Sequence, residues 1–355
     1  MQKQIQKLLN TSKKVFQDCA QSNGAIVAAN SRKKYAPPAA KNYFFVWPRD
    51  AYFVCRAAKK VGLELQPKFF DWCLRNTDFQ KFGLFREKYF TNGKPKFTHF
   101  QLDQTASVLL NLHDFFGGKM PRDSKYRPLV ANCADTLARL WTGKNFAVVN
   151  EDLWEERLCF PDLEENFAYT LAAVSRGLNC ANELIPRKKW IQAAAKMQKK
   201  LVTKFPKNYF RSAGKLNDTR VDASLLGLVF PSEVADARDA KIRRTVELIE
   251  EKLVKNGGVH RYENDKYDGW MWEKTTHRQK GAGYWPLLNF WLAIYFVEAG
   301  DRKKALLYYK KVLRDLGDAS FIPEQIFENK IQVGISPLAW SHAMFVLASQ
   351  KLGFC

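Results

Sequence analysis

Residues 152–156 read Asp152-Leu153-Trp154-Glu155-Glu156, and they precede a helical pattern that opens near Leu163. The stretch places two carboxylates beside a large aromatic side chain. An apolar wall beside a carboxyl group disfavours its charged form and raises its pKa, which a general acid requires at neutral pH. A second carboxylate across a pocket would complete an acid/base pair able to cleave glycosidic bonds. The alternative is that Glu155 and Glu156 are solvated charges at a helix N-terminus, where acidic residues are common.

Helical periodicity extends outward from this stretch in both directions. The segments with helical spacing of apolar residues are 1–19, 49–61, 67–76, 102–116, 127–141, 164–182, 188–204, 223–228, 234–255, 285–299, 303–316 and 337–351. Strand-like alternation is sparse. About twelve helices without a strict repeat predict an all-α fold with an inner and an outer ring of helices. Because no segment has the composition of a linker, we expect one domain over residues 1–355.

The composition is that of a globular protein with an aromatic interior or pocket, because 46% of the residues are hydrophobic and 14% aromatic. No apolar run approaches the roughly 18 residues of a membrane helix, and the first residues lack the apolar core of a signal peptide. The seven cysteines form an odd set without metal-ligand spacing. They are typical of scattered, buried thiols in a reducing compartment, so we expect a cytoplasmic protein.

The net charge of +21 raises the question of a nucleic-acid partner. Lysines and arginines are spread along the whole chain in short runs, as at 32–34, 187–189 and 302–304. No zinc-finger spacing, aromatic RNA-binding pattern or basic arm accompanies them. We therefore expect solvated helix faces with nonspecific affinity for polyanions at low salt, and neither a dedicated nucleic-acid partner nor a membrane.

Three segments between the expected helices carry polar and aromatic side chains together. The first, 43–50, ends in Trp47-Pro48-Arg49-Asp50. Adjacent Arg and Asp can form a hydrogen-bonding fork for sugar hydroxyls, and aromatic faces can pack against the ring of the sugar. The alternative is a salt-bridged helix start, in which Asp50 satisfies the free N–H groups of the first turn.

The second segment, 261–267, follows a glycine turn, and its alternative is a polar, solvated connection. The third holds Glu324 between Pro323 and Gln325, ahead of a helix that we expect to begin with Ser336 as N-cap and a proline in its first position. A single glutamate after proline is nearly uninformative. His342 and Trp340 on the last helix are more often packing residues than ligands.

Taken together, the segments resemble the glucoamylase and glucodextranase family, glycoside hydrolase family 15, in the order that the family has. The matching stretches are 24–29, Tyr43 with 47–50, 152–156, Arg261-Tyr262 with Asp265 and Tyr267, Gly283 with Trp285, 323–325 and 337–343. The resemblance covers the length of the chain. It implies a catalytic domain that is an (α/α)6 barrel.

The resemblance also implies roles for individual residues. Glu155 matches the general acid of the family and Glu324 the catalytic base. Arg49 and Asp50 match the pair that grips the terminal glucose. Tyr43 matches a tyrosine beside the reacting sugar. Glu156 and Arg261 match sugar-contacting positions, and Trp47 and Trp340 match aromatic residues that line the pocket.

These matches predict an inverting, exo-acting α-glucosidase that releases β-glucose from the non-reducing end of an α-glucan or oligosaccharide. Glu155 would protonate the departing oxygen, and Glu324 would activate a water on the opposite face of the sugar. Side chains can supply both proton transfers, so we expect no metal and no organic cofactor. Storage glucan, maltodextrin, trehalose and isomalto-oligosaccharide all remain candidate substrates.

Two features set the chain apart from the family pattern, and two other functions stay open. The sequence lacks the β-sandwich domain and the starch-binding module of many family members, and the connection over 270–280 looks longer than usual, which leaves preference beyond the first sugar open. One alternative function is a non-catalytic, glucan-binding regulatory module. The other is a basic helical interaction protein. Linkage preference and oligomeric state are not determined by the sequence.

Overall fold

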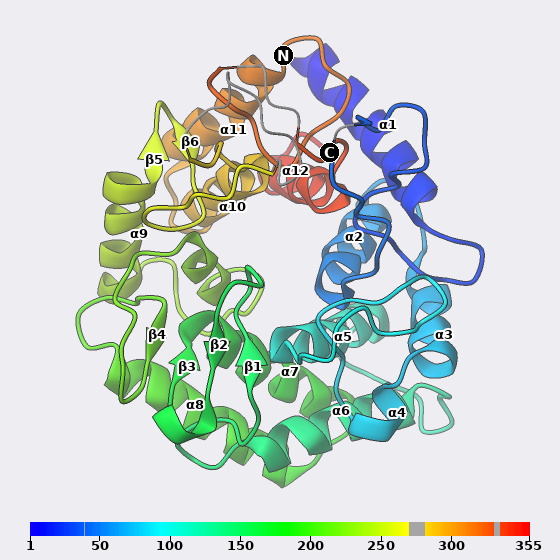
Figure 1. Cartoon of the computed structure of the whole chain (residues 1–355), viewed down its shortest axis with the longest axis vertical. Coiled ribbons are helices and arrows are strands. Elements are labelled where there is room, and N and C mark those ends of the chain that lie inside the picture. The colour runs from blue at the N-terminus through cyan, green and yellow to red at the C-terminus, as the bar shows by residue number, and fades with distance from the viewer. Residues whose placement is uncertain (39, 270–280, 330–333) are drawn as a thin grey trace.

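The computed structural model describes residues 1–38, 40–269, 281–329 and 334–355, and it shows helices arranged around a central axis (Figure 1). Outer and inner helices alternate along the chain. The outer helices are α1 (Gln2–Cys19), α3 (Gln66–Asn76), α6 (Arg127–Leu140), α8 (Lys188–Lys204), α9 (Ala240–Leu253) and α11 (Arg302–Leu316). The inner elements are α2 (Pro48–Lys60), α5 (Leu102–Phe116), α7 (Ala168–Leu184), the 3₁₀-helix η2 (Ala223–Leu228), α10 (Pro286–Glu298) and α12 (Ala339–Lys351).

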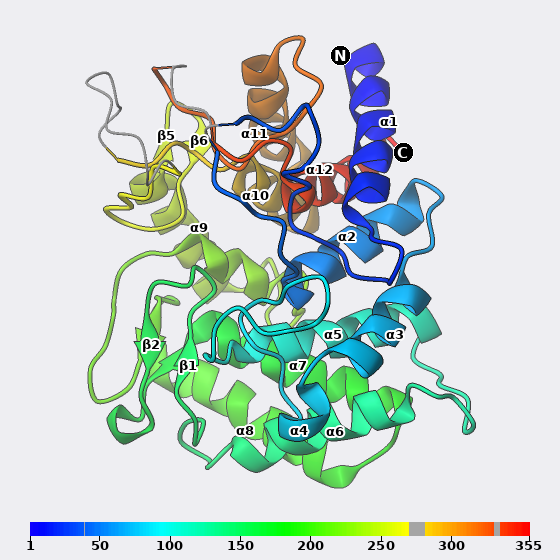
Figure 2. The ribbon, with the colours of Figure 1, turned by 45° about the vertical axis from the view of Figure 1, so that its right-hand side comes forward.

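The inner elements form a closed ring. Each one packs against the next, from α2 through α5, α7, η2 and α10 to α12, and α12 packs back against α2. Helix α1 runs alongside α12 and joins the two ends of the chain (Figure 2). The fold is therefore the all-α double ring of six helical hairpins that the sequence predicts.

The two rings differ in the way their sequences distribute apolar residues. In α10 and α12 every residue over 286–296 and 339–349 is buried, so these helices are covered on all sides. The outer helices bury one stripe only. Helix α8 buries Trp190, Ala193, Ala194, Met197 and Leu201 and presents six lysines on its other faces. Lysine and arginine therefore lie mainly on the outside of the double ring, as expected for solvated helix faces.

Extended structure is limited to three antiparallel pairs of two-residue strands within the described ranges. They are β1 (Asn150–Glu151) with β2 (Leu158–Cys159), β3 (Asn166–Phe167) with β4 (Ser212–Ala213), and β5 (Val254–Lys255) with β6 (Gly258–Val259). Such short strands show no alternation in a sequence, which explains why they were not expected. The first pair is the most consequential, because its loop is the stretch 152–157.

Several expected helix boundaries are wrong. The helix over 164–182 begins only at Ala168, because residues 158–167 form β2, the 3₁₀-helix η1 (Pro161–Leu163) and β3. The helix over 234–255 begins at Ala240 behind an Asp239 cap, and 223–228 is a 3₁₀-helix. Ser336 is not the N-cap of the last helix, since α12 begins at Ala339 after Leu338. The short helix α4 (Phe79–Phe82) was not expected.

The structure bears on two expectations about the chain as a whole, the absence of membrane-spanning helices and the burial of the cysteine thiols. Among the helices of the described ranges, none combines the length and the apolarity that crossing a membrane requires. All seven cysteines are free thiols, and only Cys355 among them is exposed. The expectation of scattered, mostly buried thiols is confirmed.

Candidate active site

Glu155 lies at the tip of the β1–β2 hairpin, which extends toward the centre of the ring (Figure 1). Asp152 closes the hairpin loop, because its Oδ1 accepts hydrogen bonds from the backbone N–H groups of Glu156 at 2.9 Å and Arg157 at 3.2 Å. The guanidinium of Arg211 donates to the other oxygen of Asp152. Glu155 has φ 61°, a left-handed conformation that is uncommon for a residue with a side chain. The alternative of a solvated helix N-terminus is therefore wrong.

The carboxylate of Glu155 is held by donors on both oxygens. Trp47 Nε1 donates to Oε1 at 2.5 Å, and Lys88 Nζ donates to Oε2 at 2.8 Å. Arg49 Nη2 lies 3.8 Å from Oε1. Burial opposes the charged form, but Lys88, a hydrogen bond with Glu87 and the charge of Arg49 outweigh burial and lower the pKa of Glu155.

The lowered pKa corrects the expectation that an apolar wall of Trp154 raises it. Trp154 packs away from the carboxylate of Glu155, because its indole N–H donates to Asp222 Oδ1 at 2.9 Å. The ring of Trp154 lies against Trp285, with 5.8 Å between the ring centroids. Its role in this structure is to anchor the hairpin loop to the segment before η2.

Glu324 is only 2% exposed, and its backbone N–H donates to the carbonyl of Ile335 at 2.7 Å. Burial raises the pKa of Glu324 to about 7, although a hydrogen bond from Tyr43 and the charges of Arg261 and Lys41 act in the opposite direction. We expected an environment that keeps this carboxylate ionised, and the raised pKa contradicts that expectation. A Cβ at Gly269 would lie 3.7 Å from Glu324 Oε2, so backbone approaches the carboxylate closely there.

Two tyrosine hydroxyls lie within the electrostatic reach of both glutamates. Tyr43 and Tyr267 are joined by a hydrogen bond of 2.8 Å between their hydroxyls, and Lys41 Nζ donates to the Tyr267 hydroxyl at 3.2 Å. After burial, the charge of Glu324 and then that of Glu155 contribute to the raised pKa of each tyrosine. The hairpin tip and the segment before α12 thus bring their carboxylates to one site.

Arg49 and Asp50, at the start of α2, are 3% and 6% exposed. Arg49 Nη1 lies 3.2 Å from Asp103 Oδ2, Nη2 lies 3.4 Å from Asp50 Oδ1, and the guanidinium carbon lies 5.1 Å from the centroid of Trp340. Burial raises the pKa of Asp50 to about 7 against the charge of Arg49. Asp50 Oδ1 accepts no hydrogen bond from any described residue, so it does not act as the cap that the alternative interpretation requires.

Arg261 is fixed between two carboxylates on the other side of the hairpin loop. Its Nη2 donates to Glu156 Oε1 at 2.7 Å and to Asp265 Oδ1 at 2.7 Å. The hydroxyl of Tyr262 donates to the second oxygen of Glu156. Arg261 is 3% and Tyr262 8% exposed, so the start of the segment 261–267 is buried. Asn264 and Lys266 are exposed, as the alternative of a solvated connection expects.

Several buried polar atoms around this site have no hydrogen-bond partner among the described residues, although buried polar atoms almost always have one. Each belongs to a residue already placed at the site or to one packed against it. They are Arg49 Nε, Asp50 Oδ1, Glu324 Oε2, both amide atoms of Gln325, Trp285 Nε1 and Trp340 Nε1. Donors and acceptors are both present, so a ligand rich in hydroxyl groups would satisfy them.

Glu87 and Lys88 are site residues that the sequence did not point to. Both lie in the long connection between α4 and α5, and Lys88 Nζ contacts Glu87 Oε1 at 2.5 Å as well as Glu155. Burial and the neighbouring charge of Glu155 raise the pKa of Glu87 to about 9. Nothing in the local sequence distinguishes these residues from ordinary loop charges, because their importance depends on the hairpin folding back over them.

Glu87, His99 and Glu151 each place one oxygen or nitrogen within 4.8 Å of the other two, a spacing that merits comparison with a metal site. Carboxylates and imidazole are ligands for divalent cations. The ammonium of Lys88, however, already lies 2.5 Å from Glu87 and would repel a cation bound there. The cluster fits proton sharing better than metal binding.

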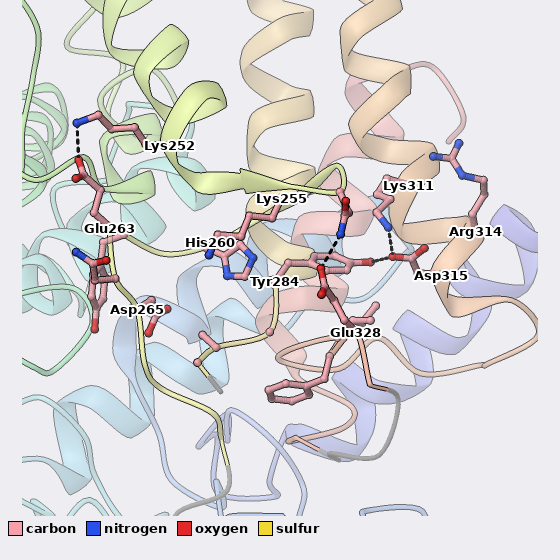
Figure 3. Close-up of a pocket in the computed structure, with 18 residues that line it drawn as sticks. Lys252, Lys255, His260, Glu263, Asp265, Tyr284, Lys311, Arg314, Asp315 and Glu328 are labelled. Carbon is pink, nitrogen blue, oxygen red and sulfur yellow. Dashed lines mark hydrogen bonds and ion pairs between the residues drawn. The ribbon is translucent and has the colours of Figure 1, made fainter. Parts of the chain in front are cut away.

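A cavity of about 1010 Å³ opens beside the candidate site (Figure 3). Three side-chain pairs mark its walls: Lys252–Glu263, Asn256–Glu328 and Lys311–Asp315. Tyr262 and Asp265 also line it, so it lies on the far side of the wall that holds Arg261. Of the described residues around it, neither catalytic candidate is a lining residue. The connection 270–280, which we expect to border the site, lies outside the described residues.

Comparison with known proteins identifies relatives along nearly the whole chain. Residues 2–350 match the Glycosyl hydrolases family 15. An uncharacterized glycosyl hydrolase of Methanocaldococcus jannaschii is 29% identical over 342 residues, covering 88% of this chain and 51% of that protein. A glucoamylase of Clostridium sp. is 25% identical over 352 residues (86% and 46%). Trehalase 1 of Sulfolobus acidocaldarius is 23% identical over 360 residues (93% and 60%). The chain thus spans about half the length of the curated relatives it matches.

Solved structures show the same fold. A wild-type glycosidase superposes with a TM-score of 0.78 at 20% identity, covering 99% of this chain and 98% of that chain. A bacterial glucoamylase complexed with acarbose gives 0.77 at 22% identity, covering 97% and 55%. The expected (α/α)6 barrel is confirmed. With a family match over almost every residue, the chain belongs to glycosyl hydrolase family 15.

Proposed function

We propose that this protein is an inverting, exo-acting α-glucosidase that releases β-glucose from the non-reducing end of α-glucans or oligosaccharides. The observation that carries the proposal is the set of buried, unpaired polar atoms on Arg49, Asp50 and Glu324. These atoms surround a site that two carboxylates, Glu155 and Glu324, approach from different segments. A terminal glucose offers hydroxyl groups that both donate and accept, and so could pair with all three kinds of atom.

In the proposed reaction Glu155 protonates the departing glycosidic oxygen while Glu324 deprotonates a water on the opposite face of the sugar. We expect the two carboxyl groups to stand roughly 6.5–9.5 Å apart in the sugar complex, which leaves room for that water. Arg49 and Asp50 grip the hydroxyls of the terminal glucose. Tyr43, Trp47 and Trp340 flank the ring, and Glu156 with Arg261 holds the neighbouring hydroxyls.

The pKa shifts of the two glutamates, taken alone, would favour the opposite roles, because Glu324 holds its proton more tightly than Glu155. Glu155, however, shares a hydrogen bond with Glu87, whose pKa burial and the charge of Glu155 raise to about 9. The pair therefore carries one proton at neutral pH. A proton is available beside the departing oxygen, which supports the acid role for Glu155.

The linkage of the natural substrate stays a matter for experiment. Glucoamylase and trehalase both occur among the relatives, so α-1,4-glucans and trehalose are both candidates. α-1,6-Linked oligosaccharides are a third. We also propose that residues 1–355 act as one catalytic domain, and that the protein works in the cytoplasm, where its seven free thiols would stay reduced.

Glucose release from a panel of maltose, maltotriose, isomaltose, trehalose, starch and dextran tests the proposal. We expect release from at least one member of the panel, and none from a Glu324→Gln enzyme prepared in the same way. Binding of the sugars without any release by the wild type would favour a non-catalytic, glucan-binding module. Salt-dependent binding of nucleic acid without sugar binding would favour a basic interaction protein.

A further inference from the structure

Four titratable side chains form a row that leads from Glu155 to the surface. Lys88 Nζ lies 2.5 Å from Glu87 Oε1 and 2.8 Å from Glu155 Oε2, so it bridges these two carboxyl groups. Glu87, Glu151 and His99 each place one oxygen or nitrogen within 4.8 Å of the other two. Glu151 Oε1 lies 3.8 Å from His99 Nδ1. The side chain of His99 is 51% exposed, whereas Glu87 and Glu151 are 3% and 7% exposed. The row therefore has one end at the candidate acid and the other in solvent.

The carboxylates of this row cannot all be ionised together at low cost. Lys88 contacts Glu87 and Glu155, and Arg49 lies 3.8 Å from Glu155, but the other charges facing Glu151 are carboxylates, Glu155 and Asp152. Glu151 Oε2 has no hydrogen-bond donor among the described residues. Buried carboxylates that lack donors and face one another share protons in place of ionising.

We propose that Glu87 and Glu155 hold one proton between them, and that Glu151 and His99 return a proton from solvent to this pair in each catalytic cycle. The inference rests on the proposed hydrolase function. Glu87 does not touch the sugar in this account: it acts through Glu155 and is a positioning residue. The row explains how a carboxylate whose own environment favours ionisation can still serve as an acid.

The proton balance of one cycle is simple. The Glu155 carboxyl gives its proton to the glycosidic oxygen as the bond between that oxygen and the anomeric carbon breaks, and water, losing a proton to Glu324, bonds to that carbon. The proton that Glu155 gives is the one it shares with Glu87, so its transfer leaves both carboxyl groups ionised. Glu87 is reprotonated through Glu151 and His99 from solvent, and Glu324 releases its proton to water. One proton enters on the His99 side and one leaves from Glu324.

The route matters because the other faces of Glu155 are occupied. Trp47 Nε1 and Lys88 Nζ already donate to its two oxygens, and the sugar covers the remaining approach during a cycle. A tryptophan N–H cannot supply a proton at physiological pH. Glu87 is a neighbouring carboxyl group that can, since Lys88 holds it beside Glu155 by contacting both side chains.

Glu87→Gln is the test variant, because glutamine keeps the hydrogen bond to Glu155 but cannot pass on a proton. We expect kcat for maltose, or for whichever glucoside proves the best substrate, to fall by at least about tenfold at pH 8. On α-glucosyl fluoride, whose leaving group needs no proton, kcat should stay within about twofold. His99→Gln should lose part of its kcat on the glucoside only, and imidazole buffer should restore it.

The control pair is His113 and Glu183, a surface histidine and glutamate 2.6 Å apart with no place in the site. His113→Gln and Glu183→Gln should match the wild type on both substrates. Equal losses on the glucoside and the fluoride for Glu87→Gln would overturn the inference, because a merely structural role affects both alike. Failure of imidazole to restore His99→Gln would overturn the route through His99.

Infrared spectroscopy of the protein without substrate gives a reading that does not depend on turnover. At pH 8 the wild type should show a protonated carboxyl band that Glu87→Gln lacks. If the two spectra do not differ, the shared proton is refuted whatever the activity. If the band is present but no glucoside is hydrolysed, the proposed hydrolase function fails while the shared proton stands.

Discussion

Asp50 Oδ1 is a buried acceptor without a donor among the described residues, and it lies beside Arg49 at the start of α2. In the proposed complex a hydroxyl of the first glucose fills this gap, so the contact is made with every substrate. Asp50→Asn keeps the shape of the side chain but removes a charged acceptor. We expect kcat/KM to fall on the order of 100-fold on disaccharides as well as on longer glucans.

Steady-state kinetics on maltose and maltotriose check this prediction. A loss confined to the longer substrate would place Asp50 outside the first subsite. Unchanged turnover of every substrate would contradict the exo-acting site.

The roles of the two glutamates can be separated by the leaving group. Glu155→Gln should abolish hydrolysis of natural glucosides but spare α-glucosyl fluoride, because fluoride departs without protonation. Glu324→Gln should depress both reactions, since water still has to be activated. Azide should partly restore turnover of the fluoride by Glu324→Ala. The test is to measure the rates of both variants on the glucoside and on the fluoride. If Glu155→Gln lost the same activity on both substrates, Glu155 would not be the acid. If Glu324→Gln instead spared the fluoride and Glu155→Gln did not, the two roles would be exchanged.

The pH dependence follows from the same groups. Glu324 must lose its proton to act as a base, so kcat/KM should rise with pH around its pKa of about 7. The Glu87–Glu155 pair must keep its proton, so activity should fall as the pH passes the pKa of Glu87, about 9. A bell-shaped profile with its maximum between these values is the expected result. A rate that falls steadily from pH 5 upward would contradict the assignment.

The residues that the family motifs point to do come together, although their roles stay predictions. Glu155, Glu324, Arg49 and Asp50 lie in segments with a recognisable local pattern. The charged side chains around these residues could not be predicted from the local sequence. Lys88 lowers the pKa of Glu155 from a loop some 67 residues away in sequence, a contact that no local pattern contains.

At the scale of single elements, the β1–β2 hairpin is what positions Glu155. Asp152 closes its loop and contacts the buried guanidinium of Arg211, which is 4% exposed. Asp152→Ala would leave Arg211 with Asp222 as its remaining ion-pair partner. We expect the free energy of unfolding to fall by about 3–5 kcal/mol. Urea titration measures it.

Asp123→Ala is the matched control for Asp152→Ala, because Asp123 is an exposed aspartate in a surface turn. Its free energy of unfolding should stay within about 0.5 kcal/mol of the wild type. If the two variants were equally stable, the hairpin loop would not depend on Asp152.

Helices were predictable where apolar residues recur at helical spacing in the sequence. Long helices with clear helical periodicity, such as α5 and α8, begin and end where the sequence predicts. The hairpins were missed because each strand has two residues, and β3 pairs with a strand about 45 residues later. The acidic stretch around Leu163 has good helix formers, but it forms the short 3₁₀-helix η1, and pairing of Asn166 and Phe167 with β4 delays the start of α7 to Ala168.

At the scale of the whole molecule, the inner ring closes because α12, near the end of the chain, packs against α2, near its beginning. About twelve helices without a strict sequence repeat predicted two concentric rings. The strong positive charge belongs to the outer ring, where α8 carries six lysines and no acidic residue. An uncharged sugar would interact only weakly with these lysines.

The charge of +21 and the glucosidase reaction should therefore respond differently to salt. Binding to duplex DNA should weaken roughly 1000-fold between about 50 and 200 mM salt, as expected of nonspecific phosphate contacts. kcat/KM for an uncharged glucoside should not change over that range. Fluorescence anisotropy and a glucose assay in the same buffers provide the comparison. DNA binding that persists at 200 mM salt would favour a dedicated nucleic-acid function.

The anomer of the glucose released first tests the central claim most directly. ¹H NMR of the anomeric protons can follow the hydrolysis of the best α-glucoside at high enzyme concentration, before mutarotation mixes the anomers. Water delivered by Glu324 on the face opposite Glu155 must yield β-glucose, so the β-anomer signal should grow first. If the α-anomer appears first, the reaction proceeds with retention, and the account of Glu155 and Glu324 as an inverting pair is wrong.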